Sequence, residues 1–355
     1  MTFCVALSEL RRVDEPRFGA KSANLGELLS AGIRVPAGFA LSARAFAAFI
    51  DESGLAGRIE HAVAALADAD ADADRIGAVS HAISESMRSA PVPDAVQDEI
   101  ARRYEDLACV SGVRSPPVAV RSSAVGEDSQ EVTFAGQQES YLWVRGAEHV
   151  CDAVRDCWVS LYSPPAISYR ARLAGRDQPP AMGVTVQLMV DAEVSGVMFT
   201  CNPVSGDPSM IAINASWGLG LAVVGGEVTP DHYLVSKVTR ELVRERVSAK
   251  QVEYVPDAQG RGAVRVEVPA PRRDVRCLNE QELATLVHAA GAVERYFGSH
   301  QDIEWALARY VALRERLFIL QSRPVTALPQ RHGPEPGDAL SMVMATFGAR
   351  CRGAS

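Results

Sequence analysis

The sequence lacks a surplus of basic residues. Of its 355 residues, 36 are Lys or Arg and 44 are Asp or Glu, which gives a formal net charge of −8. A chain with this balance has no general attraction to nucleic acid or to an anionic membrane surface. We therefore expect no nucleic-acid or membrane partner, and any bound phosphate must be held by local cations.

Paired cysteines and long apolar runs are also missing. The seven cysteines include no C-x-x-C pair, and an odd count without a repeated spacing favours free thiols in a reducing compartment. The first residues, MTFCVALSELRRVDE, lack the basic-then-apolar order of a signal peptide. No apolar run approaches the ~20 residues of a membrane-spanning helix. These absences predict a cytoplasmic protein.

The common phosphate-binding loop is absent as well. The stretch FGAKSANLGELL, residues 18–29, places Lys21 before an apolar helical pattern, but Ala20 stands where a Walker A loop requires glycine. A lysine in a glycine-flanked turn at a helix start still suits an anion, because free backbone N–H groups and the helix dipole favour negative charge there. The alternative is an ordinary solvated lysine.

The composition is that of a globular protein, with 47% hydrophobic and 23% charged residues, and the length allows two or three compact units. Helical patterns concentrate in the first part, over 22–30, 43–50 and 92–108. In the third of these, Asp94 is the expected N-cap, and one apolar stripe contains Val96, Ile100, Tyr104 and Leu107.

Strand patterns concentrate later in the chain. Residues 183–190, GVTVQLMV, alternate strictly, as a half-buried strand does. A strong helix over 279–297 precedes two adjacent strands, QDIEWALARY (301–310) and RLFILQSRP (316–324). Helices early and strands later, without an internal repeat, indicate an α+β fold.

Polar residues occur on the last two of these strands. Gln321 and Arg323 share one face of the sheet, since side chains on one face recur every second residue. Glu304 on the neighbouring strand would add a carboxylate, and a carboxylate with an amide oxygen suits Mg²⁺ bound to nucleotide phosphates. The alternative is a structural salt bridge between Glu304 and Arg323.

Arg121 ends a strand and precedes a polar run within VRSSAVGEDSQEVTFAGQQESYL. A guanidinium there suits bidentate capture of a phosphate beneath a mobile lid, or alternatively an Arg–Glu pair on a surface hairpin. With Lys21, Glu304, Gln321 and Arg323, it supplies the cations and oxygens of an ATP–Mg²⁺ phosphoryl-transfer site. No nucleophile or general base is evident.

Five stretches, in order, resemble the N-terminal nucleotide-binding domain of the phosphoenolpyruvate synthase and pyruvate phosphate dikinase family, which the rifampin phosphotransferases share. They are GAKSANLGELLSAGIRVPAGFALS, VAVRSSAVGEDSQEVTFAGQQESYL, VSGVMFTCNPVSGD, GLGLAVVGGEVTPDHY and DIEW…LFILQSRPVT. The resemblance implies an ATP-grasp fold with two α+β lobes that clamp ATP. We expect the lobes at 1–180 and 181–328, followed by a linker and tail at 329–355.

The resemblance also implies roles for residues at the matching positions. Lys21, Arg121 and Arg323 would hold phosphates and act in catalysis, while Glu304 and Gln321 would ligate Mg²⁺. The phosphate-capping loop would include Gly136 and Gln137, and Gln187 would lie near the adenine pocket. Two departures stand out: relatives usually show G-L-G-E where this chain has Leu221, and the hairpin between Glu304 and Gln321 is several residues longer than usual.

Full-length members of the family are relays in which ATP phosphorylates a histidine on a small swivelling domain. The carrier histidine follows a Thr/Gly-rich stretch that does not appear here after QSRPVT, and His81 and His300 lack the glycine-rich lead. We therefore expect the ATP-binding subunit of a split enzyme whose partner subunit holds the carrier and substrate domains. This arrangement resembles phenylphosphate synthase, which phosphorylates a phenol and releases AMP and phosphate.

Two other classes of function remain open from the sequence. One is a self-contained ATP-grasp kinase or ligase that acts directly on a small molecule and needs no partner. The other is a non-catalytic ATP-binding regulatory subunit that signals by closing its lobes. Retention of the five polar residues argues against a decayed site, whereas Leu221 departs from the family pattern.

Overall fold

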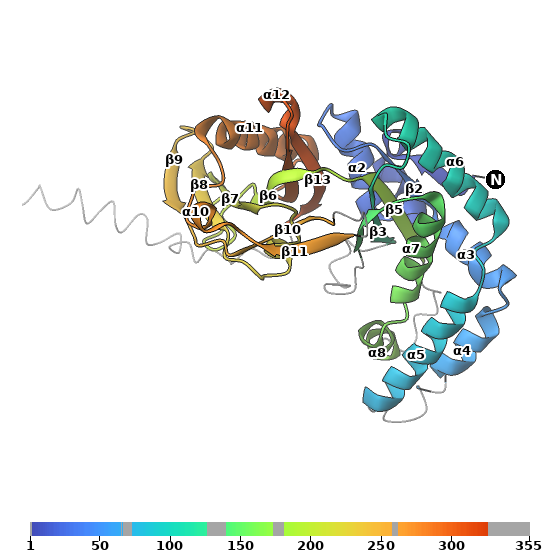
Figure 1. Ribbon diagram of the computed structural model, residues 1–355. Coiled ribbons are helices and arrows are strands. Elements are labelled where there is room, and N and C mark those ends of the chain that lie inside the picture. Colours follow the sequence, from blue (N-terminus) through green and yellow to red (C-terminus); the bar gives the residue numbers. More distant parts are fainter. Residues whose placement is uncertain are drawn as a thin grey trace, which may run out of the picture.

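The computed structural model describes residues 2–64, 66, 73–125, 140–172, 181–257 and 262–325. These residues form two sheet-based bodies side by side (Figure 1). The first body combines a five-stranded sheet with most of the helices, and the second contains a six-stranded sheet with a long helix across one face. The α+β class expected from the sequence is confirmed.

The first sheet joins strands from distant parts of the chain. Its antiparallel order is β1 (Cys4–Ala6), β2 (Gly38–Leu41), β5 (Met182–Leu188), β3 (Val118–Ala124) and β4 (Ser140–Val144). Because β5 lies between β2 and β3, this sheet extends past the lobe boundary expected at residue 180. We propose that the lobes divide after Leu188 instead.

Strand β5 is buried on both faces, so the half-buried strand read from its alternation is wrong. Val184 and Val186 pack into the core of the first body. On the opposite face, Thr185 shares a hydrogen bond with Ser22, and Gly183 lies against the backbone of Phe18. Helices cover both sides of the central strand, which the alternation of valines could not reveal.

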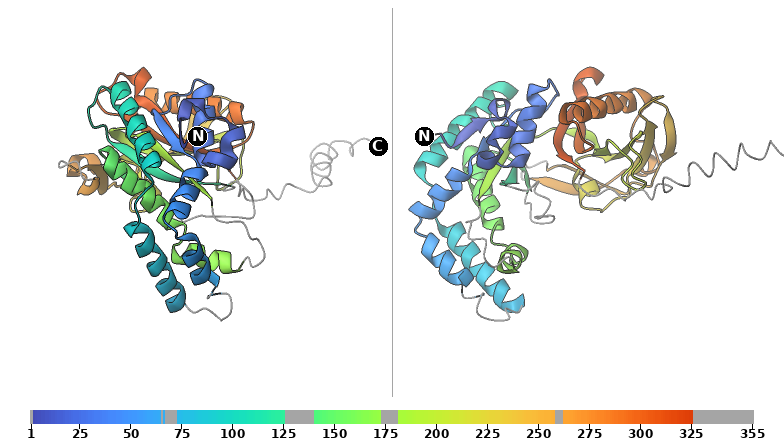
Figure 2. Two further views of the ribbon diagram at one scale, coloured as in Figure 1. Left: turned by 90° about the vertical axis from the view of Figure 1, so that its right-hand side faces the viewer. Right: turned by 180° about the vertical axis from the view of Figure 1, so that it is seen from behind.

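The helices of the first body pack mainly on one side of its sheet (Figure 2). Its helical elements are η1 (Leu7–Glu9), η2 (Arg12–Asp14), α1 (Glu15–Phe18), α2 (Ala20–Ser30), α3 (Ala43–Glu52), α4 (Ala56–Ala64), α5 (Ala73–Ser89), α6 (Asp94–Ser111), α7 (Ala147–Ser160) and α8 (Pro164–Arg172). The predicted apolar stripe of α6 is buried. Pro93 rather than Asp94 occupies its N-cap position, because the helix begins at Asp94.

The second sheet is antiparallel throughout. Its order is β13 (Leu317–Pro324), β12 (Gln301–Ala308), β6 (Ala192–Phe199), β7 (Met210–Trp217), β8 (Asp231–Ser236) and β9 (Leu242–Arg246). Helix α11 (Glu280–Phe297) begins with a capping box between Asn279 and Glu282, which satisfies its first backbone donors. Its buried residues pack with Ile303 and Trp305 of β12.

Shorter elements complete the second body. They are α9 (Leu221–Val224), the hairpin of β10 (Val252–Pro256) and β11 (Ala263–Glu267), α10 (Ala270–Arg273) and α12 (Leu313–Arg316). Tyr254 and Ala263 of this hairpin pack against a cluster that contains Trp143 of the first body. None of the described helices combines the length and the apolar composition that a bilayer span requires.

Helix α2 lies between the two sheets (Figure 1). Ser22 contacts Thr185 of the first sheet at 2.7 Å, and Asn24 donates to the carbonyl of Ser322 in the second sheet at 3.4 Å. Leu25 and Leu28 are buried in the core of the second body. The helix that contains Lys21 is therefore fixed to both sheets.

Candidate functional site

Lys21 is buried rather than solvated. Only 5% of the residue is exposed, and its Nζ donates to the carbonyl oxygen of Ser122 on β3 at 2.9 Å. Gly19, with φ of 80°, lets the chain turn into α2 close to β3, where a Cβ atom would lie 2.2 Å from the Ser123 carbonyl oxygen. The solvated alternative is wrong, because the glycine turn draws the helix start against the strand.

Arg121 joins the two bodies. Its Nη2 donates to Glu304 Oε2 at 2.8 Å and to Gln321 Oε1 at 2.9 Å, and its Nη1 donates to the Leu320 carbonyl at 3.3 Å. The arginine side chain is 13% exposed. The sequence left open an Arg–Glu pair within a surface hairpin. That alternative is wrong about the partner, because the glutamate that pairs with Arg121 is Glu304 of the second sheet.

Strands β12 and β13 pair as the sequence predicts. Glu304 lies opposite Gln321, and Asp302 lies opposite Arg323, so all four side chains share one face. The register shifts after Glu304 and leaves Leu320 as an extra residue, a bulge of the kind that redirects strands beside functional sites. This bulge lies directly beside the Glu304–Gln321 pair.

Arg323 does not pair with Glu304. It contacts Asp302 through Nη2 at 2.8 Å and through Nε at 2.9 Å, with 60% of the arginine side chain exposed. The alternative of a Glu304–Arg323 salt bridge is therefore wrong. Arg323 lies near the last residue of β13, Pro324, and two residues after Gln321.

Glu304 has an acidic pKa. Burial works to raise the pKa of its carboxyl, but the charge and hydrogen bond of Arg121, with the charges of Lys21 and Arg323, hold this pKa below its usual range. The group is therefore an anion at neutral pH. An anionic carboxylate and the Gln321 amide oxygen converge on one nitrogen of Arg121, so the two oxygens already point to a common position.

A cavity of about 470 Å³ opens between the bodies beside this cluster. That volume lies in the ordinary range for small-molecule sites. Arg121, Glu304 and Gln187 are among its polar lining residues, while Leu142 and Met189 belong to its apolar lining. Gln187 is buried and donates to the Pro36 carbonyl at 3.4 Å.

The structure describes Leu221 but not the expected phosphate-capping residues. Leu221, at the position of the family glutamate, lines the same cavity with Val224 and Glu227. Gly136 and Gln137 lie outside the described residues. The sequence did not identify Tyr254, which lines the cavity, or Asp302, which pairs with Arg323. Asp302 could have been identified, because it lies two residues before Glu304 on the same face of the strand.

The described part of the chain contains no group of three or more His, Cys, Asp or Glu side chains that could hold a metal ion. Glu304 and Gln321 supply one carboxylate and one amide. A Mg²⁺ ion needs further oxygens, which nucleotide phosphates and water provide in sites of this kind.

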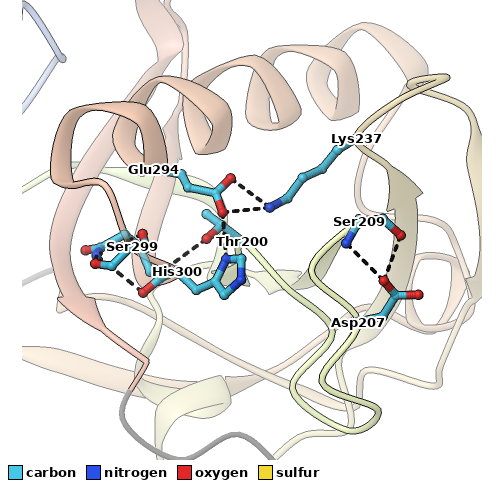
Figure 3. Close-up of polar contacts among 8 residues, drawn as sticks. Thr200, Asp207, Ser209, Lys237, Glu294, Ser299 and His300 are labelled. Carbon is cyan, nitrogen blue, oxygen red and sulfur yellow. Dashed lines mark hydrogen bonds and ion pairs between the residues drawn. The ribbon is translucent and has the colours of Figure 1, made fainter. Parts of the chain in front are cut away.

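The two histidines considered as carriers lie away from the cavity lining. His81 is exposed on α5. His300 contacts Glu294 Oε1 through Nδ1 at 2.6 Å, and Lys237 donates to the same carboxylate at 2.7 Å (Figure 3). Its ring is thus part of a polar cluster at the beginning of β12.

Comparison with known proteins agrees with the geometry. The family described as "Pyruvate phosphate dikinase, AMP/ATP-binding domain" matches residues 15–342. A probable phosphoenolpyruvate synthase of Methanocaldococcus jannaschii is 38% identical over 92% of this chain and 27% of its own length. One of Methanothermobacter thermautotrophicus is 41% identical over 90% of this chain and 45% of its own length.

A phosphoenolpyruvate synthase of Aeropyrum pernix is 36% identical over 90% of this chain and 42% of its own length. The chain thus spans between about a quarter and a half of the relatives that it matches. The family match covers nearly all of the described residues, including Lys21, Arg121 and the paired strands β12 and β13. The chain belongs to the pyruvate phosphate dikinase AMP/ATP-binding domain family.

Proposed function

We propose that this chain clamps ATP–Mg²⁺ between its two bodies, in the manner of an ATP-grasp enzyme. It would transfer a phosphoryl group from this ATP to a histidine outside its described residues. The observation that supports this most is the contact of Arg121, from the first sheet, with Glu304 and Gln321 of the second. A cation, a carboxylate and an amide from two separate bodies meet at the edge of a ligand-sized cavity.

In this proposal the apolar part of the cavity takes the nucleoside, near Gln187 and Met189. The triphosphate extends toward Arg121, with Lys21 and Arg323 beyond it. These cations stabilise the negative charge that spreads over the phosphoryl oxygens in the transition state. The loop around Gly136 and Gln137 would cover the phosphates.

The metal would be held jointly by protein and nucleotide. Glu304 and Gln321 fit a Mg²⁺ ion as its protein ligands, because hard oxygens suit this cation and their two oxygens already converge on one position. Bound there, the ion would neutralise phosphate charge. Arg121 would then exchange its contacts with Glu304 and Gln321 for contacts with a phosphate.

The acceptor would be an imidazole that the described residues do not place in the cavity. Attack of its unprotonated nitrogen on phosphorus breaks one phosphoanhydride bond, and the electron pair leaves on the oxygen of that bond. Water would break the second phosphoanhydride bond and release phosphate, so that the nucleotide product is AMP. We propose that this histidine belongs to a partner subunit that also holds the substrate domain. The supply of the nucleophile by another polypeptide accounts for a site made only of charge-stabilising groups.

The final acceptor is proposed from chemical class. Relatives named phosphoenolpyruvate synthase suggest dikinase chemistry, in which ATP yields AMP and phosphate and one phosphoryl group reaches a small molecule. With a phenol as acceptor, ATP, water and the phenol would give AMP, phosphate and an aryl phosphate. A self-contained kinase or ligase, and a non-catalytic ATP-binding regulatory subunit, are the competing proposals.

The test uses purified chain with Mg²⁺ and ATP labelled at either the β or the γ phosphorus. A candidate partner with a Thr/Gly-rich histidine segment is present or omitted. We expect acid-labile label on the partner only when both proteins are present, with a loss of at least about 100-fold in R121A. R88A, which removes the Arg88–Asp156 surface pair, should transfer label normally.

Each other outcome selects a competing proposal. Label on this chain alone, or ATP turnover without the partner, would overturn transfer to a partner and support a self-contained enzyme. Tight ATP binding without transfer in either mixture would support the regulatory subunit. The labelled position would identify the phosphate that moves.

A further inference from the structure

The connection between β12 and β13, residues 309–316, is the part of the hairpin that the family resemblance marks as longer than usual. Arg309 begins it and contacts the segment where the chain crosses between the bodies. Its backbone N–H donates to the Asp191 carbonyl at 2.9 Å, and its Nε lies 3.4 Å from Asp191 Oδ1. Its Nη2 lies 3.9 Å from Glu253 Oε2 on β10.

Arg316 ends the connection and contacts three further elements. Its Nε donates to the Ala308 carbonyl at 2.9 Å, and its Nη1 donates to Glu282 Oε1 at 2.6 Å. Its Nη2 forms an ion pair with Glu193 at the start of β6. Since Glu282 also caps α11, Arg316 joins the end of β12, the beginning of β6 and the beginning of the helix.

The acidic partners alternate with residues that line the cavity. Val190 and Ala192 are lining residues on either side of Asp191, and Tyr254 is the lining residue after Glu253. Successive side chains of an extended chain point to opposite sides. Arg309 and Arg316 therefore contact one side of the segments 190–193 and 253–254, and the other side of these segments lines the cavity. We call these two segments the wall of the nucleotide site.

Glu253 depends on these contacts. It is 5% exposed, and its Oε2 has no hydrogen-bond partner among the described residues. Its nearest cationic partners are Arg272 at 3.6 Å and Arg309 at 3.9 Å. A buried carboxylate oxygen without a hydrogen bond requires a nearby cation, so loss of Arg309 should displace β10 and Tyr254 with it.

We propose that Arg309 and Arg316 are positioning residues for the nucleotide site: they fix the wall formed by residues 190–193 and 253–254. The inference rests on the proposed function, because it assigns that wall to the nucleoside. The wall would contact the nucleoside, whereas Arg121, with Glu304 and Gln321, would lie at the phosphates. It also gives the longer connection a function in this chain.

The test is the dissociation constant of the full chain for ATP–Mg²⁺ and for AMP, measured by titration calorimetry. R309A and R316A should each raise both constants by about tenfold, because the nucleoside is common to the two ligands. R121A should weaken ATP much more than AMP. R88A, an arginine in an ion pair on the first body, should leave both constants unchanged.

R309K gives a second measurement if R309A does not fold. It retains the positive charge but not the fork of donors, so we expect a smaller increase in both constants. Folded R309A and R316A that bind both ligands as tightly as the wild type would overturn the inference alone. A wild-type chain that binds neither ligand would overturn the proposed function and the inference with it.

Discussion

At the scale of single residues, the position of Lys21 depends on a neighbouring glycine. Gly19 has φ of 80° and ψ of 159°, a conformation that is essentially restricted to glycine. Its hydrogen atom faces the Ser123 carbonyl, so any side chain would push α2 away from β3. Because Nζ of Lys21 bonds to the Ser122 carbonyl, such a displacement would also move the lysine.

Gly19→Ala should therefore reduce the free energy of unfolding by more than about 3 kcal/mol, since backbone strain and a contact with backbone add. Gly32→Ala is the matched control, because Gly32 has φ of 73° but no atom within 4 Å of the added Cβ. It should cost only about 1–2 kcal/mol. Urea unfolding checks both, and equal losses would show that the approach to β3 contributes nothing.

Elements of the second body are joined by a buried ion pair between Asp231, in the stretch TPDHY, and Lys250. Lys250 and Asp231 are fully buried, with Nζ 2.5 Å from Oδ1. The same carboxylate accepts from the backbone N–H of Ser248 at 2.9 Å and of Cys277 at 2.8 Å. It thus joins β8 to the loop before β10 and to the segment before α11.

Asp231→Ala should cost about 3–5 kcal/mol, because it leaves the Lys250 ammonium buried without a counter-charge. The double variant Asp231→Ala with Lys250→Met should recover part of this loss. Asp156→Ala, which removes the surface partner of Arg88, should cost less than about 1 kcal/mol. A small loss for Asp231→Ala in urea unfolding would mean that the elements are joined by packing instead.

The sequence predicts those elements whose signals are local. The apolar stripe of α6, helix α11 and the pairing of Glu304 with Gln321 follow from periodicity within one segment or between neighbouring segments. The place of β5 between β2 and β3 does not, because it depends on pairing between distant segments, and β2 lies more than a hundred positions before β5. The contact of Arg121 with Glu304 and the burial of Lys21 against Ser122 could not be predicted for the same reason, because each joins residues more than a hundred positions apart.

At the scale of the whole molecule, the two bodies should unfold together. A chain of 355 residues with two sheets would ordinarily unfold in separate steps. Here α2 is buried between the sheets, bonded to Thr185 on one side and to Ser322 on the other. Arg121 adds a direct bond between β3 and β12. Opening either body exposes this shared helix.

Segment-resolved hydrogen exchange in increasing urea tests this coupling. Helix α7 in the first body and α11 in the second should lose protection at the same urea concentration. ATP–Mg²⁺ at 100 times its dissociation constant should then stabilise both helices equally, by about 2.7 kcal/mol, because a ligand held by both bodies is released only when they separate. Stabilisation of α11 alone would place the nucleotide on the second body and contradict a clamp formed by both.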